Sequence, residues 1–171
     1  MANWTWLVLL LNNASPFASA QFDSVYTHIA KDCESLSVPE NDGSDPSLSC
    51  RGPDELVARI DFSAADAALN MVMDMQGVEQ ALESGILGID VEKGVIEWRR
   101  VNDLPIAIIV RSFPMVLDVN GLAYRGAQQT LEIRGLNRLV GFSASIDTRS
   151  TPNANEVARQ RIAEAWQQES K

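Results

Sequence analysis

Residues 95–113, VIEWRRVNDLPIAIIVRSF, decide the fold class. Both ends of this stretch are rich in β-branched and aromatic residues, and residues 102–105 between them supply the Asn, Asp and Pro that turns use. The pattern predicts a β-hairpin with arms at 95–101 and 106–113. Since residues 106–110 are apolar without interruption, we expect the second arm to be a central strand covered on both faces.

Segments on either side of the hairpin are also predicted to be strands. In residues 55–62, apolar side chains recur at every second position, which is the period of a half-buried strand. Residues 67–75 contain the Ala and Met that favour helices, but Leu and Met alternate there with Asn, Val and Asp, so we predict a strand. We interpret the methionines as flexible core filler rather than as a soft-metal site. The other candidate strands are 24–30, 128–134 and 139–146.

Two segments are predicted to be connections. Residues 76–94 contain four glycines and are expected to form a connector with one helical turn at 78–83. Residues 114–126 contain the turn pair Asn120-Gly121 and are expected to form the tip of a long hairpin.

A helix is predicted at the end of the chain. Asn153 follows Pro152 and precedes Glu156 by three positions, the spacing of a capping box. The apolar side of this helix consists of Ala154, Val157, Ala158, Ile162 and Ala165. The sequence therefore predicts an α+β fold, a mainly antiparallel sheet of about six or seven strands with a C-terminal helix packed on one face.

The start of the chain predicts export. Residues 1–20 contain no charged side chain, and an apolar run at 4–11 leads to Ala18-Ser19-Ala20, which resembles a signal-peptide cleavage site. We expect residues 1–20 to be a signal peptide and residues 21–171 to be a single exported domain, periplasmic or extracellular. The apolar run is too short to span a bilayer and no later segment is long enough, so no membrane span is expected.

The two cysteines, Cys33 and Cys50, both belong to the part predicted to be exported. In an oxidising compartment such a pair favours a disulfide. A redox or metal pair fits less well, because the C-x-x-C spacing is missing and His28 is the one histidine where a structural zinc site uses four ligands. The chain also contains no P-loop and no G-x-G-x-x-G sequence. We therefore expect neither a metal site nor a cofactor.

The net charge of −9 is unevenly distributed along the chain. Residues 21–92 carry fifteen acidic and three basic side chains, whereas residues 93–171 carry eight acidic and eleven basic ones. An acidic first half argues against nucleic acid and permits attraction to a cationic envelope protein or peptide. Asp42, Asp45 and Asp54 are the candidate acidic patch for such a partner. The simpler interpretation is that the charge keeps the protein soluble.

Cationic side chains flank a tryptophan on the central hairpin. Trp98, Arg99, Arg100 and Arg111 are candidates for an anion-binding patch. In the structural interpretation, these arginines belong to a salt-bridged solvent face around one buried Trp, with Glu97 pairing across strands. The sequence leaves both interpretations open.

Four short stretches resemble a family of small exported proteins of alphaproteobacteria that has no assigned function. They are EWR at 97–99, LPIAIIVR at 104–111, FSASID at 142–147 and PNANEVAR at 152–159. The resemblance implies export and a β-rich fold, and it implies no reaction. Members of that family carry a Cys-His pair just before the last strand, where this chain has Gly141 and Phe142. Any role of that pair is therefore absent here.

The sequence contains no catalytic motif, such as G-x-S-x-G. Our hypothesis is a non-enzymatic binding or inhibitor-like module of the cell envelope with an acidic surface. The alternative is an envelope hydrolase that uses two carboxylates from the acidic half. A deep cleft with two facing carboxylates would favour the hydrolase, and a flat or convex acidic surface would favour the binding module.

Overall fold

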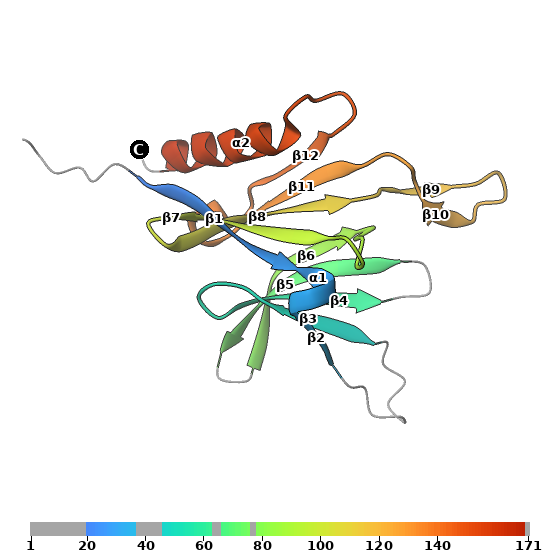
Figure 1. Cartoon of the computed structure of the whole chain (residues 1–171), viewed down its shortest axis with the longest axis horizontal. Helices are drawn as coiled ribbons and strands as arrows, with labels where there is room; N and C mark the ends of the chain where they lie inside the picture. The colour runs from blue at the N-terminus through green and yellow to red at the C-terminus, as the bar shows by residue number, and fades with distance from the viewer. Residues whose placement is uncertain (1–19, 37–45, 63–65, 76–77, 170–171) are drawn as a thin grey trace, which may run out of the picture.

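The computed structural model describes residues 20–36, 46–62, 66–75 and 78–169, with the backbone path alone for 73–75 and 78–84. Two five-stranded antiparallel sheets and a C-terminal helix are stacked as three layers (Figure 1). The predicted α+β class is confirmed. The strands are more numerous than the sequence indicated, since the described residues form twelve strands in three sheets.

The middle layer, sheet A, contains in spatial order β1 (Phe22–His28), β7 (Val95–Val101), β8 (Leu104–Ser112), β11 (Thr130–Gly135) and β12 (Ser143–Asp147). The lower layer, sheet B, contains β2 (Cys33–Leu36), β3 (Ser47–Arg51), β4 (Leu56–Phe62), β5 (Ala67–Met75) and β6 (Val78–Leu87). A two-stranded hairpin, β9 (Met115–Leu117) and β10 (Ala123–Arg125), projects beyond both sheets (Figure 1). The helices are α1 (Ile29–Asp32), the 3-10 turn η1 (Asn137–Leu139) and α2 (Ala154–Glu169). Among the described residues, no helix has the length and apolar character needed to cross a membrane.

The predicted central hairpin is confirmed as β7 and β8, and β8 lies in the middle of sheet A. Ile108 and Val110 face the core between the two sheets, while Ala107 and Ile109 face the core under α2. Both faces of β8 are thus covered, as its uninterrupted apolar sequence predicts. The turn itself is shorter than predicted and consists of Asn102 and Asp103, whose φ angles of 48° and 66° are typical of a tight hairpin turn.

Trp98 fills the core between the sheets, where it is 0% exposed. Its indole Nε1 donates a hydrogen bond of 2.9 Å to the Thr27 hydroxyl, so the one polar atom of the ring is satisfied. Gly52 packs directly against the ring: a Cβ placed on it would lie 2.5 Å from two ring carbons of Trp98. The close approach of β3's end to Trp98 therefore requires glycine at this position.

The predicted disulfide between Cys33 and Cys50 is confirmed. The two cysteines are direct partners across β2 and β3, with their Cα atoms 4.3 Å apart. The sequence did not predict these two strands, because both are short and consist largely of polar residues. The disulfide fastens β2, an edge strand, to the rest of sheet B.

The predicted connector at 76–94 is wrong for most of its length, because residues 78–87 form strand β6. Its pairing with β5 shifts register twice, which is why the alternation in the sequence is broken. The neighbouring prediction of a strand at 67–75 is confirmed as β5. The hairpin tip predicted at 114–126 is confirmed as β9 and β10, and the strands predicted at 128–134 and 139–146 correspond to β11 and β12.

Helix α2 begins at Ala154, as predicted, and buries Ala158 and Ile162 against sheet A. The predicted capping box is wrong. Asn153 has a φ of 56°, in the left-handed region, whereas an N-cap residue is extended. Its carbonyl oxygen accepts the first helical hydrogen bond from Val157 N at 3.1 Å, and Glu156 lies beside Arg159 instead.

Candidate functional site

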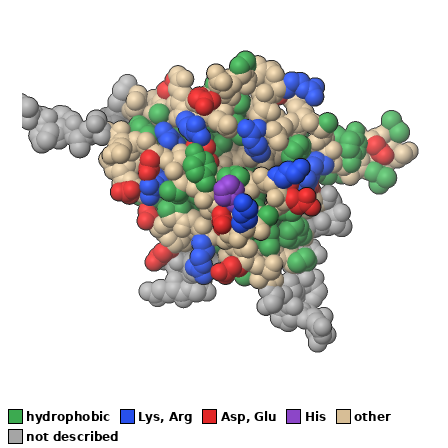
Figure 2. All heavy atoms as spheres, viewed as in Figure 1, with side chains coloured by type: hydrophobic (Ala, Val, Ile, Leu, Met, Phe, Trp, Pro, Cys, Tyr) green, Lys and Arg blue, Asp and Glu red, His purple; other side chains and the backbone are tan. Residues whose placement is uncertain are grey.

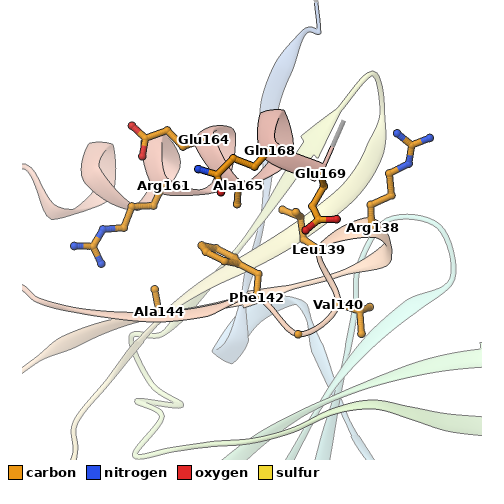
Figure 3. Close-up of a pocket in the computed structure, with 11 residues that line it drawn as sticks. Arg138, Leu139, Val140, Phe142, Ala144, Arg161, Glu164, Ala165, Gln168 and Glu169 are labelled. Atoms are coloured by element: carbon orange, nitrogen blue, oxygen red, sulfur yellow. The ribbon is translucent and has the colours of Figure 1, made fainter. Parts of the chain in front are cut away.

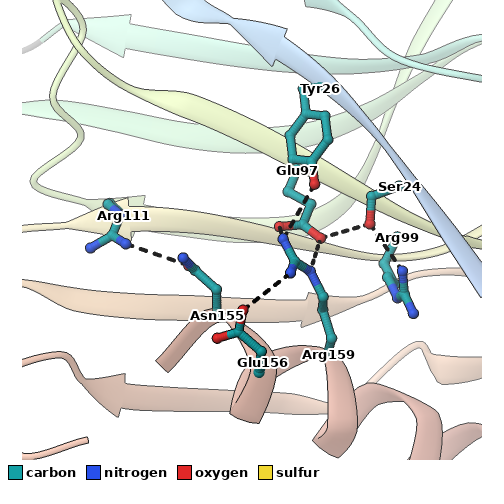
Figure 4. Close-up of polar contacts among 8 residues, drawn as sticks. All are labelled: Ser24, Tyr26, Glu97, Arg99, Arg111, Asn155, Glu156 and Arg159. Carbon is teal, nitrogen blue, oxygen red and sulfur yellow. Dashed lines mark hydrogen bonds and ion pairs between the residues drawn. The ribbon is translucent and has the colours of Figure 1, made fainter. Parts of the chain in front are cut away.

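Helix α2 covers only part of sheet A. Near the N-terminal end of the helix, the face of the sheet formed by β1 and β7 is open. The helix packs against β11, β12 and η1. Tyr26 on β1 is 51% exposed as a result. Polar side chains from the first two turns of α2, Asn155 and Arg159, reach across to this open part of the sheet (Figure 4). The candidate site lies between these two side chains and the strands.

A buried carboxylate on β7, Glu97, organises this region. Glu97 is only 6% exposed and accepts two hydrogen bonds from Arg159, from Nε to Oε1 at 2.7 Å and from Nη2 to Oε2 at 3.0 Å. The Ser24 hydroxyl donates a third bond, of 2.7 Å, to Oε1. This bidentate pair raises the pKa of Arg159 above its ordinary value. Glu97 thus holds the helix to the open half of sheet A.

A pocket of about 230 Å³ lies beside this ion pair. Its apolar lining consists of Val95, Ile109, Val110 and Leu131. Its polar lining consists of Tyr26, Lys93, Glu97, Arg111, Asn155 and Arg159. We call this cavity the basic pocket, because three of these side chains are cationic and the one carboxylate is already paired with Arg159.

Arg111 and Lys93 are the cations of the basic pocket that Glu97 does not neutralise. Arg111 donates to two neutral side chains, to Gln129 Oε1 at 2.7 Å and to Asn155 Oδ1 at 3.4 Å (Figure 4). Within the described parts of the chain, no ion pair joins Arg111 or Lys93 to a carboxylate. The pocket wall therefore carries positive charge without an internal counter-ion.

The four residues of the predicted anion-binding patch are not brought together. Arg111 lines the basic pocket, and Trp98 lies on the opposite face of β7, buried between the sheets. Arg100 also points away from α2 and forms an ion pair with Asp23, with Nε 3.0 Å from Oδ1. Hydrogen bonding and the charge of Arg100 lower the pKa of Asp23.

Arg99, the fourth member, shares the α2-facing side of β7 with Glu97 but lies outside the basic pocket. Its Nη1 donates to the Ser24 hydroxyl at 3.1 Å, and its guanidinium lies 5.5 Å from the centre of the Phe22 ring. Burial lowers the pKa of Arg99. Arg99 therefore extends the hydrogen-bond chain from Arg159 through Glu97 and Ser24 (Figure 4).

The predicted acidic patch is placed only in part. Asp42 and Asp45 lie outside the described residues. Asp54 is exposed in the turn between β3 and β4, where its φ is 53°. In the described residues, no group of three or more His, Cys, Asp or Glu side chains is arranged to hold a metal ion.

The sequence did not single out Tyr26, Lys93, Asn155 or Arg159. Their convergence depends on the pairing of β1 with β7, in which Tyr26 lies opposite Glu97, and on where α2 crosses the sheet. The local sequence specifies neither the strand pairing nor the position of the helix on the sheet. One local signal was available: Asn155 and Arg159 are four positions apart on the helix and flank its apolar side.

Comparison of the chain with models of protein families finds no match. Neither the curated proteins nor the solved structures contain a match to it. The resemblance to small exported alphaproteobacterial proteins stays a prediction.

Proposed function

We propose that the protein is an exported, non-enzymatic binding module that holds a small organic anion in the basic pocket. The observation that carries this proposal is that Arg111 and Lys93 lie in the wall of a cavity and have no carboxylate partner among the described residues, in a chain whose net charge is −9. Arg111 is half-buried, so water solvates its charge only in part. A bound anion supplies the missing counter-charge.

The shape and lining of the basic pocket support a ligand with an apolar part. The floor is built from buried aliphatic residues, among them Ile109 and Leu131. The volume of about 230 Å³ is below the range of about 300–1,000 Å³ that is usual for ligand pockets, so the ligand must be small. Arg111 offers the planar donor geometry that suits a carboxylate or sulfonate. The N-terminal end of α2 adds positive potential near Asn155. A short aliphatic or aromatic carboxylate fits these features.

The hydrolase alternative receives no support from this pocket. Glu97, which lines it, accepts three hydrogen bonds and is paired with Arg159. No second carboxylate lines the cavity among the residues that the structure describes. Hydrolysis of a glycosidic bond uses two carboxyl groups on either side of the substrate.

A titration followed by amide chemical shifts tests the proposal, with benzoate and inorganic phosphate as probes. We expect benzoate to cause saturable shifts at Val95, Arg111 and Asn155, and phosphate to bind more weakly because it has no apolar part. Replacing Arg111 with Gln should weaken benzoate binding by about tenfold or more, since a hydrogen bond to a charged group contributes about 1.5–3 kcal/mol. Lys93→Gln, at an exposed position, should weaken it less.

The matched control is Arg51→Gln, which removes an exposed cation from sheet B. It should leave benzoate binding unchanged. If Arg51→Gln and Arg111→Gln weaken binding equally, the probe responds to net charge rather than to the pocket, and the proposal is wrong. It is equally wrong if benzoate causes no saturable shift at the lining residues.

A second candidate function is the binding of a cationic envelope protein or peptide to the acidic part of the molecule. The three-layer fold favours it, because sheet B and α1 are built from residues 29–87, within the acidic half of the sequence. Residues 93–171, which carry more basic than acidic side chains, form α2 and most of sheet A. The difference in charge between the two halves of the sequence thus becomes a difference between sheet B and the two layers formed by sheet A and α2.

Export of residues 21–171 after removal of residues 1–20 is part of the same proposal. It is supported by the Cys33–Cys50 disulfide, since such bonds persist in oxidising compartments.

A further inference from the structure

We propose that the ligand of the basic pocket is a small monocarboxylate, and that its carboxylate takes the place of the Asn155 side-chain oxygen on Arg111. Asn155 then determines the specificity of the pocket, because it is the hydrogen-bond partner that Arg111 exchanges for the ligand. This mode of binding rests on the proposed function. It adds the chemical class of the anion and the residue that the anion displaces.

The two hydrogen-bond partners of Arg111 differ in distance and in place. Gln129 Oε1 accepts from Nη1 at 2.7 Å, whereas Asn155 Oδ1 accepts from Nη2 at 3.4 Å, which is longer than the usual range of about 2.7–3.2 Å. Asn155 lines the pocket, and Gln129 is not among the described residues that line it. Nη1 is therefore fixed from outside the cavity, and Nη2 is the donor that an entering ligand can reach (Figure 4).

A ligand carboxylate can replace the Asn155 oxygen without leaving a polar group unsatisfied. An ionised carboxylate is a stronger acceptor for a guanidinium group than a neutral amide oxygen. Asn155 is half-buried rather than packed in the core, so its displaced amide is free to turn over. The Nδ2 of Asn155 then donates to the second carboxylate oxygen. The exchange gives Arg111 a charged partner and keeps Asn155 hydrogen-bonded.

The apolar floor of the pocket belongs to the same face of sheet A as Arg111. Leu131 on β11 is the cross-strand partner of Arg111, and Ile109 precedes Arg111 by two positions on β8. Both side chains are buried. A ligand held at Nη2 therefore has aliphatic side chains next to it, and a volume of about 230 Å³ leaves no room for a long spacer between the carboxylate and its apolar group.

The charges of the lining favour a ligand with a single negative charge. Arg159 is bound by both carboxylate oxygens of Glu97 and is already neutralised. Lys93 is exposed, so water solvates its charge. Within the described lining, Arg111 is thus the half-buried cation that is left for a ligand, which suits one carboxylate rather than two.

The larger cavity between α2 and β12, of about 600 Å³, does not offer such a site. Figure 3 shows its charged lining residues, which are Arg138, Arg161, Glu164 and Glu169. Two carboxylates accompany the two guanidinium groups, so an anion would be repelled as well as attracted there. On the face drawn in Figure 2, most Lys and Arg side chains lie over sheet A and α2, the two layers that build the basic pocket.

Isosteric charge changes at the two partners of Arg111 test this mode of binding. Asn155→Asp places a carboxylate where the carboxylate of the ligand is expected, whereas Gln129→Glu adds the same charge on the outer side of Arg111. In the benzoate titration, Asn155→Asp should bind about tenfold or more weakly than Gln129→Glu, because two carboxylates would compete for one place. Gln167→Glu, at an exposed position near the other end of α2, is the matched control for net charge and should bind like the wild type.

The Asn155→Asp variant should fold at least as well as the wild type. Its new carboxylate lies in the first turn of α2, where negative charge is favourable, and beside Arg111. Its unfolding temperature should therefore not fall below that of the wild type, so that lost binding is not due to unfolding.

Two further probes test the class of ligand. Benzamide lacks the charge of benzoate, and terephthalate would place a second carboxylate against the apolar floor, where it loses its water. Both should bind the wild type about tenfold or more weakly than benzoate.

The possible failures are distinguishable. If benzoate causes no saturable shift at Val95 in the wild type, the proposed function and this mode of binding are both wrong. If benzoate binds and Arg111→Gln weakens it, but Asn155→Asp and Gln129→Glu bind equally well, the function stands and the exchange at Asn155 is wrong. Terephthalate that binds as tightly as benzoate would overturn the monocarboxylate class. Saturable shifts at Phe142, which lines the larger cavity, in place of Val95 would overturn the assignment to the basic pocket.

Discussion

At the scale of single residues, the interior shows which side chains the fold requires. Trp98 is fixed by three contacts of different kinds: its hydrogen bond to Thr27, the aliphatic residues of both sheets, and the close approach of Gly52. Glu97, one position earlier, faces the opposite side of the same strand and is satisfied by Arg159 and Ser24. Because side chains alternate along β7, the apolar Trp98 and the buried ion pair of Glu97 with Arg159 lie on opposite faces of the same strand.

Replacing Gly52 with Ala should destabilise the domain by about 1–3 kcal/mol, because the added methyl group would overlap a ring that has no room to move. The measurement is the free energy of unfolding by urea. Gly85→Ala is the matched control, since the nearest atom to its Cβ would be 3.7 Å away, an ordinary contact. If the Gly52→Ala variant proves as stable as the Gly85→Ala variant, Trp98 is not fixed as described.

At the scale of elements, the sequence predicted those with regular patterns and missed those without. Strands β4, β5, β7 and β8 have clear periodicity or unbroken apolar runs, and all four were predicted. Strand β6 was missed because glycines and register shifts hide its alternation. The start of α2 was correctly located but misinterpreted in detail, because Asn is common both at N-caps and in the left-handed conformation.

The conformation of Asn153 leads to a prediction that separates these two roles. Ser is as good as Asn at an N-cap but has no special tolerance of positive φ. Asn153→Ser should therefore cost about 1 kcal/mol of stability, whereas Asn153→Gly should be close to neutral because glycine adopts this φ freely. Thermal and urea unfolding of the two variants provide the measurement. A stable Ser variant together with a destabilised Gly variant would contradict this prediction and indicate that Asn153 is the N-cap of a capping box.

At the scale of the whole molecule, the sequence predicted the fold class but could not predict how the layers meet. The basic pocket requires Tyr26, Glu97 and Arg159. Tyr26 precedes Glu97 by more than seventy positions along the chain, and Arg159 follows Glu97 by more than sixty. A second cavity, of about 600 Å³, likewise needs η1, β12 and the second half of α2. Such sites depend on strand order and on where a helix crosses a sheet, and periodicity does not specify either.

The separation of charge between layers supports the last prediction, which concerns the second candidate function. Attraction between exposed charges is screened over about 8 Å at physiological ionic strength, so binding of an oligolysine peptide should weaken as salt is raised. Changing Asp42, Asp45 and Asp54 together to Asn should abolish most of it. Changing Asp103, Glu164 and Glu169 to their amides removes the same charge from the other half of the chain and should have little effect. Fluorescence anisotropy of a labelled peptide measures both. Equal losses in the two triple variants would mean that only net charge matters, and the acidic half would then serve solubility rather than recognition.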